Sequence, residues 1–315
     1  MNTPTILGIV GPTGVGKSAV AERLARAWGG EIVSADSMQV YRGMDIGTAK
    51  TPPGERGVPY HCIDLIDPGT AYSAALYQRD AREAVEDMMR RGRLPVFVGG
   101  TGLYVRAALD EMEFPRGEIT SPAREALERL AREEGSQALH DRLRAVDPPA
   151  ADLVHPNNVR RVVRALEMAQ EGTSYATQAG GFSERRSWRP GTVLIGLFCE
   201  RDALYSRIDS RVDQMVAAGL LGEVAGLLER GYRDALTATQ AIGYKELVPV
   251  LEGVADLEPA LEAIKRATRR YAKRQMTWFR ADERIAWVDV TGLSSAEATS
   301  RVRELLESAA PGTRL

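Results

Sequence analysis

The sequence has few of the residues that build metal clusters or disulfide frameworks. Its 315 residues include two cysteines, Cys62 and Cys199, and three histidines, and none of them forms a CxxC pair or a Cys/His cluster. We therefore expect no zinc site and no disulfide scaffold, and an intracellular, cytoplasmic location is the simplest expectation.

Long apolar runs are missing as well. No stretch reaches the roughly 18 apolar residues that a membrane span needs. The segment MNTPTILGIV at the start lacks the charged beginning and the long apolar region of a signal peptide. We therefore expect no membrane contact and no targeting segment.

Neither sign of charge dominates the sequence. The net charge is −2, so any attraction to nucleic acid must come from a local patch. The chain of 315 residues, with 44% hydrophobic residues, fits one large α/β domain or two units. No feature of the sequence demands a dimer, so we expect a monomer.

Short apolar segments alternate with amphipathic ones along much of the chain. Residues 5–10 predict a buried strand, 17–28 a helix and 31–35 a second strand. Such a βαβ beginning implies a parallel sheet. The same patterns predict further helices and strands: helices at 73–91 and about 202–218, and strands at 93–100, 192–199 and 285–290.

Residues 112–190 differ from this pattern and predict an all-helical insert. Ser121, Pro122 and Gly135 have the positions of an N-cap, a first helical residue and a stop. We expect an α/β core of residues 1–111 and 191–315, and a mobile return loop at 172–190. A second insert helix has an apolar face of residues at i, i+3, i+4 and i+7, namely Val159, Val162, Val163 and Leu166.

The segment GPTGVGKS matches the phosphate-loop pattern G-x-x-x-x-G-K-[ST] and lies between a predicted strand and a predicted helix. Backbone amides and the helix N-terminus would bind phosphate oxygens, Lys17 would reach the terminal phosphate, and Ser18 would hold Mg²⁺. A glycine-rich turn without a ligand is the alternative. The predicted phosphate-binding residues are Gly11, Pro12, Thr13, Gly14, Val15, Gly16, Lys17 and Ser18.

A carboxylate ends the strand EIVSADSMQV, at Asp36. Many phosphate-loop enzymes place an aspartate at the end of another strand, where it helps to hold Mg²⁺. Here LPVFVGG leads into Gly99, Gly100 and Thr101 without an acid. This arrangement suits an enzyme whose phosphate leaves and whose second substrate needs a base. Asp36 could instead cap a helix or bind Mg²⁺.

Six separated motifs occur in one order and resemble a known family: GPTGVGKS, SADSMQVYRGMDIGTAK, DPGTAYSAALYQRDA, LPVFVGGTGLY, HPNN-V-RRVVRALE and AKRQMTWFR. From about residue 5 to 290 the chain resembles the bacterial tRNA dimethylallyltransferase (tRNA isopentenyltransferase) family. The resemblance implies a P-loop NTPase-like parallel sheet flanked by helices, with a helical insert that contacts tRNA. It also implies transfer of a dimethylallyl group from its diphosphate to N6 of adenosine 37, just 3′ of the anticodon.

This chemistry assigns expected roles at the acceptor side. The N6 amine is a poor nucleophile that must lose a proton, and Asp36 is our candidate for the base. Ser37, Met38 and Gln39 would line the adenine site, although Gln39 is nearly as well explained as a structural amide.

The remaining expected roles concern the leaving diphosphate, because stabilising the departing charge is the largest contribution to the rate of such a reaction. Thr101 would hydrogen-bond the leaving oxygen. Arg207 resembles the family's diphosphate-binding arginine, and Arg211, one helical turn later, is the weaker candidate. Either arginine could instead lie on a solvated helix face.

A basic stretch at 265–280, KRATRRYAKRQMTWFR, contains no acid and predicts an RNA-binding surface. Trp278 and Phe279 within it fit core packing better than base contact. In the insert helix, Glu167 could partly neutralise the arginines on the face opposite the valines. The predicted tRNA contacts are Asp36, Ser37, Met38, Gln39, Thr101, Arg160, Arg161, Arg164, Lys273, Arg274, Gln275 and Arg280.

Three other functions fit parts of the sequence. A small-molecule kinase would explain the phosphate loop and Asp36, but not the basic stretch. An adenylate isopentenyltransferase acting on free nucleotide would need neither that stretch nor the insert. A non-enzymatic RNA-binding protein would leave the intact Lys17–Ser18 pair unexplained.

Overall fold

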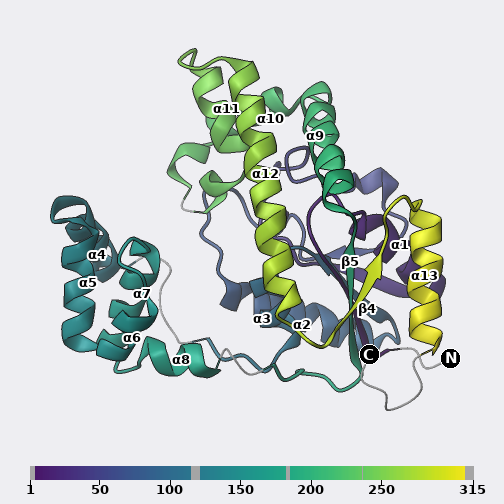
Figure 1. The fold of residues 1–315 in the computed structure, drawn as a ribbon, viewed down its shortest axis with the longest axis horizontal. Coiled ribbons are helices and arrows are strands. Elements are labelled where there is room, and N and C mark those ends of the chain that lie inside the picture. The colour runs from purple at the N-terminus through teal and green to yellow at the C-terminus, as the bar shows by residue number, and fades with distance from the viewer. Residues whose placement is uncertain (1–3, 115–120, 182–184, 236, 309–315) are drawn as a thin grey trace. The chain divides into compact units, whose positions relative to one another are not determined.

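The computed structural model describes residues 4–114, 121–181, 185–235 and 237–308. The chain divides into two compact units, coloured along the sequence in Figure 1. One unit joins Met1–Asp110 to Ser187–Leu315, and the other is Glu111–Arg186. None of the described helices is long and apolar enough to cross a membrane.

The first unit is built on a six-stranded sheet in the order β3-β2-β4-β1-β5-β6, and every pairing in it is parallel. The central strand β1 is buried along its whole length, and its Leu7 pairs with Val96 on one side and Val193 on the other. This confirms the predicted P-loop NTPase-like α/β class. The strands are β1 (Ile6–Val10), β2 (Gly30–Ser34), β3 (Tyr60–His61), β4 (Leu94–Gly99), β5 (Thr192–Phe198) and β6 (Ile285–Asp289).

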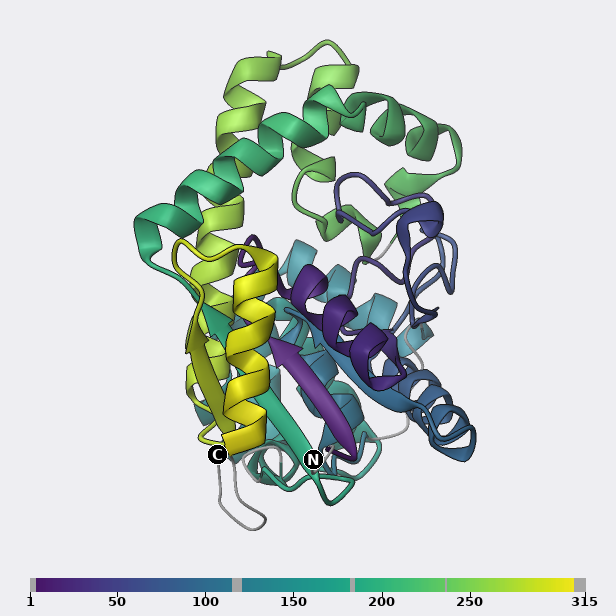
Figure 2. The same cartoon turned by 90° about the vertical axis from the view of Figure 1, so that its right-hand side faces the viewer.

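Helices cover both faces of this sheet. In Figure 2, α1 and α13 lie side by side on the face toward the viewer. The connections that contain α2, α3 and α12 move along the sheet in the direction opposite to the connection from β1 through α1 to β2. Because connections between parallel strands are right-handed, these helices lie on the other face of the sheet. The helices with bounds are α1 (Lys17–Trp28), α2 (Ala74–Arg90), α3 (Gly102–Leu109), α9 (Arg201–Ala217), α10 (Leu220–Glu229), α11 (Tyr244–Leu251), α12 (Leu257–Arg280) and α13 (Ser295–Ser308).

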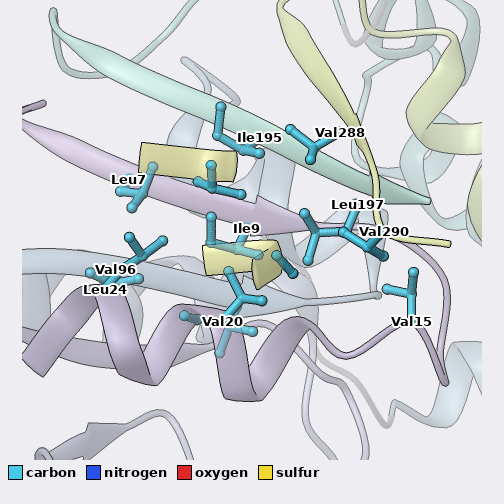
Figure 3. Packing of buried hydrophobic residues seen from close by; sticks show 14 of the residues in the cluster. Leu7, Ile9, Val15, Val20, Leu24, Val96, Ile195, Leu197, Val288 and Val290 are labelled. Atoms are coloured by element: carbon cyan, nitrogen blue, oxygen red, sulfur yellow. The ribbon is translucent and has the colours of Figure 1, made fainter. Parts of the chain in front are cut away.

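The main core lies between the sheet and α1 (Figure 3). Leu7 and Ile9 of β1 meet Val20 and Leu24 of α1, which are four residues apart and therefore share one helix face. All four side chains are buried, and each stabilises the fold by roughly 1.5–3 kcal/mol. This packing fixes the carboxyl end of β1, from which the phosphate loop starts.

The long connection from β5 to β6 carries α9, α10, α11 and α12 (Figure 1). Helix α12 packs against α9, α11 and α3, so it runs from the helices of this connection to the sheet unit. Residues far apart in the sequence are thereby brought to the carboxyl ends of the strands, where parallel α/β sheets bind their ligands.

The second unit is all-helical and has its own apolar core. Val162, Val163 and Leu166 are buried there, as the predicted stripe requires. Gly135 was expected to end a helix, but it also begins the next one, with a φ of 89° at the junction. The helices are α4 (Pro122–Glu133), α5 (Gly135–Val146), α6 (Pro148–Leu153), α7 (Val159–Gln170) and α8 (Tyr175–Gly181).

Two other expectations differ from the structure. Helix α8 occupies part of the segment predicted as a mobile return loop, and residues 182–184 of that segment lie outside the described residues. The two-residue strand β3 was not predicted, because so short a strand has no pattern of its own.

Candidate active site

The phosphate-loop motif joins β1 to α1, as predicted. Gly16 precedes the helix with a φ of 98°, and no side chain caps the first turn of α1. An uncapped first turn of this kind leaves N–H groups that can bind an anion such as phosphate. Gly11 has no room for a side chain, because an added Cβ would lie 2.4 Å from the carbonyl oxygen of Leu197.

A glutamine from α12 ties the phosphate loop to the end of β4. The backbone N–H of Thr13 donates to Gln275 Oε1 over 2.8 Å, and Gln275 Nε2 donates to the Gly100 carbonyl over 3.0 Å. Gln275 is buried, so its amide is used within the protein. A contact of Gln275 with tRNA stays a prediction.

Lys17 lies inside the loop, with its ammonium group donating to the Pro12 carbonyl over 2.7 Å. Burial and, after it, the nearby positive charge of Arg211 together lower the pKa of Lys17 from 10.5 to about 7. The negative charge of Asp36 opposes both effects. Two cations, Lys17 and Arg211, thus lie near one carboxylate, Asp36. This excess of positive charge favours the binding of an anion.

Asp36 follows β2 and closes a turn. Its Oδ1 accepts the Met38 N–H over 2.9 Å. Residues 37–40 form a turn and not a helix, so this bond is not a helix cap. Within the described ranges, Oδ2 accepts no hydrogen bond. The carboxylate is half-buried and can therefore receive a proton from a bound group.

Thr101 lies at the start of α3, against the same turn. Its Oγ1 accepts the Ser37 N–H over 3.0 Å and donates to Ser37 Oγ over 3.3 Å. The polar side chains of Thr101 and Gln275 lie near Tyr271 of α12 and lower the pKa of its hydroxyl. Burial and the charge of Asp36 nevertheless raise the pKa of this phenol to about 12. Tyr271 is thus a neutral hydroxyl between the phosphate loop and the Asp36 turn.

Some of these groups, among them Asp36, Ser37 and Tyr271, line a cavity of about 500 Å³. Thr13, Asp36, Ser37 and Met38 line it from the loops after β1 and β2. Apolar side chains complete the lining from α9, α12 and the segment before α11, among them Ile208, Val212, Met215, Ile242 and Ile264. The cavity therefore combines an anion site with an apolar wall.

The structure separates the two candidate arginines of α9. Arg211 lines the cavity and its charge acts on Lys17, whereas Arg207 is not among the lining residues. The charge of Arg207 acts instead on Cys199, whose pKa burial raises. The periodicity of α9 did not show which of the two lines the cavity, and the role of Arg207 in binding diphosphate stays a prediction.

Gln39 is held by its neighbours, as its alternative interpretation suggested. Its Oε1 accepts from Ser34 Oγ over 2.8 Å, and its Nε2 donates to the Thr48 carbonyl over 3.1 Å. Ser37 and Met38 line the cavity, whereas Gln39 does not. Gln39 therefore shapes the turn rather than presenting its amide to the cavity.

Comparison with known proteins assigns a family to this arrangement. A sequence model described as IPP transferase matches residues 39–282, and one described as isopentenyl transferase matches residues 4–56. The tRNA dimethylallyltransferase of Geobacillus thermodenitrificans is 49% identical over 298 residues, which cover 92% of this chain and 91% of the relative. The chain belongs to the tRNA dimethylallyltransferase family.

Solved structures related to this tRNA dimethylallyltransferase family member have the same fold. A full-length tRNA isopentenylpyrophosphate transferase from Bacillus halodurans is 44% identical, with a TM-score of 0.71 over 97% of this chain and 96% of that one. A eukaryotic dimethylallyltransferase acting on tRNA is 29% identical, with a TM-score of 0.79 over 98% of this chain and 81% of that one.

The basic stretch of this family member lies on α12, where its cations fall into two groups. Lys265 pairs with Asp213 and Glu262, and Arg269 pairs with Asp209. The other cations of the stretch are exposed and have no acidic partner within the described part of the chain: Arg266, Arg270, Lys273, Arg274 and Arg280. Two of these, Arg270 and Arg274, line the cavity.

The two aromatic residues near the end of α12 also differ. Phe279 is buried, as predicted, whereas Trp278 is 42% exposed. The indole of Trp278 packs closely against Gly102, directly after Thr101. The core prediction was therefore right for Phe279 and wrong for Trp278, since adjacent helix positions face different sides.

In the helical insert of this family member, Arg160 and Arg161 are exposed on α7. Arg164 donates to Glu167 over 3.4 Å, which is the partial neutralisation that the sequence suggested. Glu167 also pairs with Arg124 of α4, so it belongs to the packing of the insert.

Sequence reasoning missed several residues around the cavity. Tyr271 was given no role from the sequence, and neither were Gly47 and Thr48, although all three line the cavity. A signal existed for Tyr271, because it shares one face of α12 with Ile264, Ala267 and Arg274. No comparable signal marked Gly47 and Thr48.

Proposed function

We propose that this protein transfers the dimethylallyl group of dimethylallyl diphosphate to N6 of adenosine 37 in tRNA and releases diphosphate. The carrying observation is one cavity that contains the Asp36 carboxylate beside the phosphate loop and is lined by Arg270, Tyr271 and Arg274 of α12. In this reaction the C–O bond to the diphosphate breaks, a C–N bond forms, and one N6 proton leaves.

The donor's diphosphate would bind at the phosphate loop. The uncapped first turn of α1, Lys17 and Arg211 supply positive charge there. As the C–O bond breaks, negative charge grows on the leaving oxygen, and these groups stabilise it. The apolar wall from α9 and α12 suits a five-carbon chain and limits access of water to the allylic carbon.

Mg²⁺ fits this site as a partner of the diphosphate. The Ser18 hydroxyl is exposed in the first turn of α1. The described residues form no cluster of three or more acidic, histidine or cysteine ligands. Mg²⁺ commonly takes most of its ligands from phosphate oxygens and water, so one hydroxyl is sufficient protein contact. Bound there, it would neutralise diphosphate charge.

The acceptor adenine would lie against the Asp36 turn. Asp36 Oδ2 is our proposed acceptor for the N6 proton, with Ser37 and Met38 beside the base. Because Thr101 Oγ1 already bonds to Ser37, its expected contact with the leaving oxygen would replace or share that bond. The reacting base must leave its stack to enter a cavity of this kind.

The RNA backbone would lie along the exposed cations of α12, with Lys273, Arg274 and Arg280 as contacts. Trp278 offers an exposed aromatic face beside Thr101, on which an unpaired base can stack. Arg160, Arg161 and Arg164 of the insert are proposed as a second backbone contact. A monomeric state and a cytoplasmic location belong to the same proposal.

The deciding experiment uses dimethylallyl diphosphate labelled in its five-carbon group and an anticodon stem-loop with adenosine at position 37. We expect label on this RNA in the presence of Mg²⁺, and none when position 37 is guanosine. Label on free adenylate but not on RNA would support the adenylate isopentenyltransferase. Consumption of ATP without any label on RNA would support the small-molecule kinase and overturn the proposal.

A further inference from the structure

A carboxylate outside the motif residues binds three successive backbone amides. Glu223 Oε2 accepts the N–H groups of Asp45 and Ile46 over 2.9 and 2.8 Å. Its Oε1 accepts the N–H of Gly47 over 3.1 Å and the Tyr244 hydroxyl over 2.6 Å. Three amides directed at one point form the kind of concave site that binds anions, and here a side chain of α10 is the anion.

The bound segment is part of the cavity wall. Gly47 and Thr48 line the cavity together with Asp36 and Ser37. The Thr48 carbonyl accepts from Gln39, and Gln39 accepts from Ser34 at the end of β2. Hydrogen bonds and the Gly47–Thr48 peptide link therefore connect Glu223 to Gln39 and Ser34, which lie on either side of Asp36 in the sequence.

Close packing holds the same segment from the side of α11. An added Cβ at Gly47 would lie 2.4 Å from the ring of Tyr244, so only glycine fits there. Burial and the charge of Glu223 raise the pKa of Tyr244 well above its ordinary value, so its hydroxyl stays a donor. Charge-assisted hydrogen bonds of this kind are stronger than neutral ones.

A second anchor fixes the other side of the segment. The buried ammonium of Lys50 donates to the Tyr41 carbonyl, Asp45 and Asp64 over 2.6, 2.8 and 2.6 Å. Lys50 belongs to the same loop as Asp45, whereas Glu223 comes from α10, more than 170 residues away. Glu223 therefore decides where the loop lies relative to α9–α12.

We propose that Glu223 is a positioning residue for the acceptor base, which sets the wall formed by residues 45–48 and, through Gln39, the turn that carries Asp36. This role rests on the proposed function. Glu223 acts on the acceptor side of the site, because none of its bonds reaches the phosphate loop. Its loss is expected to impair use of the RNA while leaving binding of the diphosphate donor intact.

The test compares Glu223→Ala, Glu223→Gln and Tyr244→Phe with Glu229→Gln, a charge change on the exposed end of the same helix. Glu223→Ala should lower kcat/KM for RNA by about 10- to 100-fold, the size of effect expected from misplacing a reacting group. Glu223→Gln should retain part of the activity, because its carbonyl can still accept two of the amides. Tyr244→Phe should have the smallest loss, and Glu229→Gln none.

Two measurements separate positioning from general damage. Donor affinity should stay at the wild-type value in every variant. Hydrogen exchange at the amides of Asp45, Ile46 and Gly47 should speed up in Glu223→Ala, while exchange in β1 and α1 stays slow. If Glu223→Ala does not fold, the Gln variant decides by the same two measurements.

The outcomes are distinct. Faster exchange at residues 45–47 with unchanged RNA kinetics would overturn the positioning role, and so would equal losses of donor and RNA binding. A wild-type protein that transfers no label to RNA would overturn the proposed function itself, whereas the exchange measurement would still report whether Glu223 holds the loop.

Discussion

The phosphate loop and the segment 36–48 meet at one cavity but are built in different ways. The loop is a contiguous motif whose proposed binding groups are its own backbone N–H groups and a helix terminus, with Gln275 as a distant tie. The segment 36–48 is shaped by side chains from elsewhere, including Thr101 and Glu223. The geometry of a site made by backbone groups is set mainly by its own segment, whereas the geometry of a site made by distant side chains depends on the whole fold.

The difference matches the two halves of the proposed reaction. Diphosphate is recognised by charge and by N–H groups, which many proteins supply in the same way. An adenine amine requires one carboxylate at one position, and small displacements there are costly. The phosphate loop should therefore tolerate changes that the segment 36–48 does not.

The largest expected effect comes from Asp36→Asn. The amide still accepts the Met38 N–H but cannot take a proton at neutral pH, so transfer should fall by about 10²- to 10⁴-fold. Single-turnover transfer of labelled donor to RNA measures this loss. Donor affinity should be retained when it is measured at pH 6, because the charge of Asp36 helps to keep Lys17 protonated and its removal matters less at low pH.

The matched control is Asp67→Asn, which changes an exposed carboxylate paired with Arg42 at the surface. It should leave transfer unchanged. If Asp36→Asn lost donor binding at pH 6, Asp36 would belong with the phosphate site as a metal or structural residue. Retained transfer would refute its role as the base.

The next largest effect should come from Gln275→Ala, because Gln275 joins the phosphate loop to the end of β4. The substitution leaves the Thr13 N–H and the Gly100 carbonyl without their partner, which should lower the free energy of unfolding by about 2–3 kcal/mol. Chemical denaturation measures this change. Gln214→Ala, at an exposed position of α9, should have almost no effect. Equal stability of the two variants would remove Gln275 as a structural tie.

The fold was largely predictable because three of its strands, β1, β2 and β4, are fully buried and alternate with amphipathic helices. Such segments carry their pattern locally, as in the burial of all five residues of β1. Strand β3 and the start of α5 at Gly135 were missed, because two residues hold no period and a glycine stop does not exclude a following helix.

The site was predictable only where a contiguous motif or the end of a predicted strand marks its residues. The phosphate loop and Asp36 follow from motif and strand end, whereas the choice between Arg207 and Arg211 depends on the orientation of α9. Glu223 meets its amide partners across more than 170 residues, and Gln275 meets Thr13 across 262. No local pattern records contacts of that separation, so their roles became visible only in the fold.

A smaller effect is expected on the RNA surface, where α12 contains free and neutralised cations. Lys273→Gln with Arg274→Gln should reduce the slope of log affinity against log salt by about 1–2, because both are exposed. Lys265→Gln with Arg269→Gln should leave the slope unchanged, since their acids on α9 already neutralise them. Titration of a labelled stem-loop at several salt concentrations compares the pairs. Equal slopes would mean that position along α12 does not matter.

The smallest effect is a proton taken up when the donor binds. The pKa of Lys17 lies near 7 rather than 10.5, so most molecules carry a neutral Lys17 at pH 8. A bound diphosphate favours the ammonium form and raises this pKa, so binding should take up close to one proton at pH 8 and much less at pH 6. Calorimetry of donor binding in two buffers with different ionisation enthalpies measures the number. Arg211→Met removes a charge that lowers the pKa of Lys17, so this variant should take up fewer protons at pH 8. Proton uptake that did not depend on pH would show that Lys17 is already charged before the donor binds. The phosphate loop without donor would then already have the positive charges of both Lys17 and Arg211.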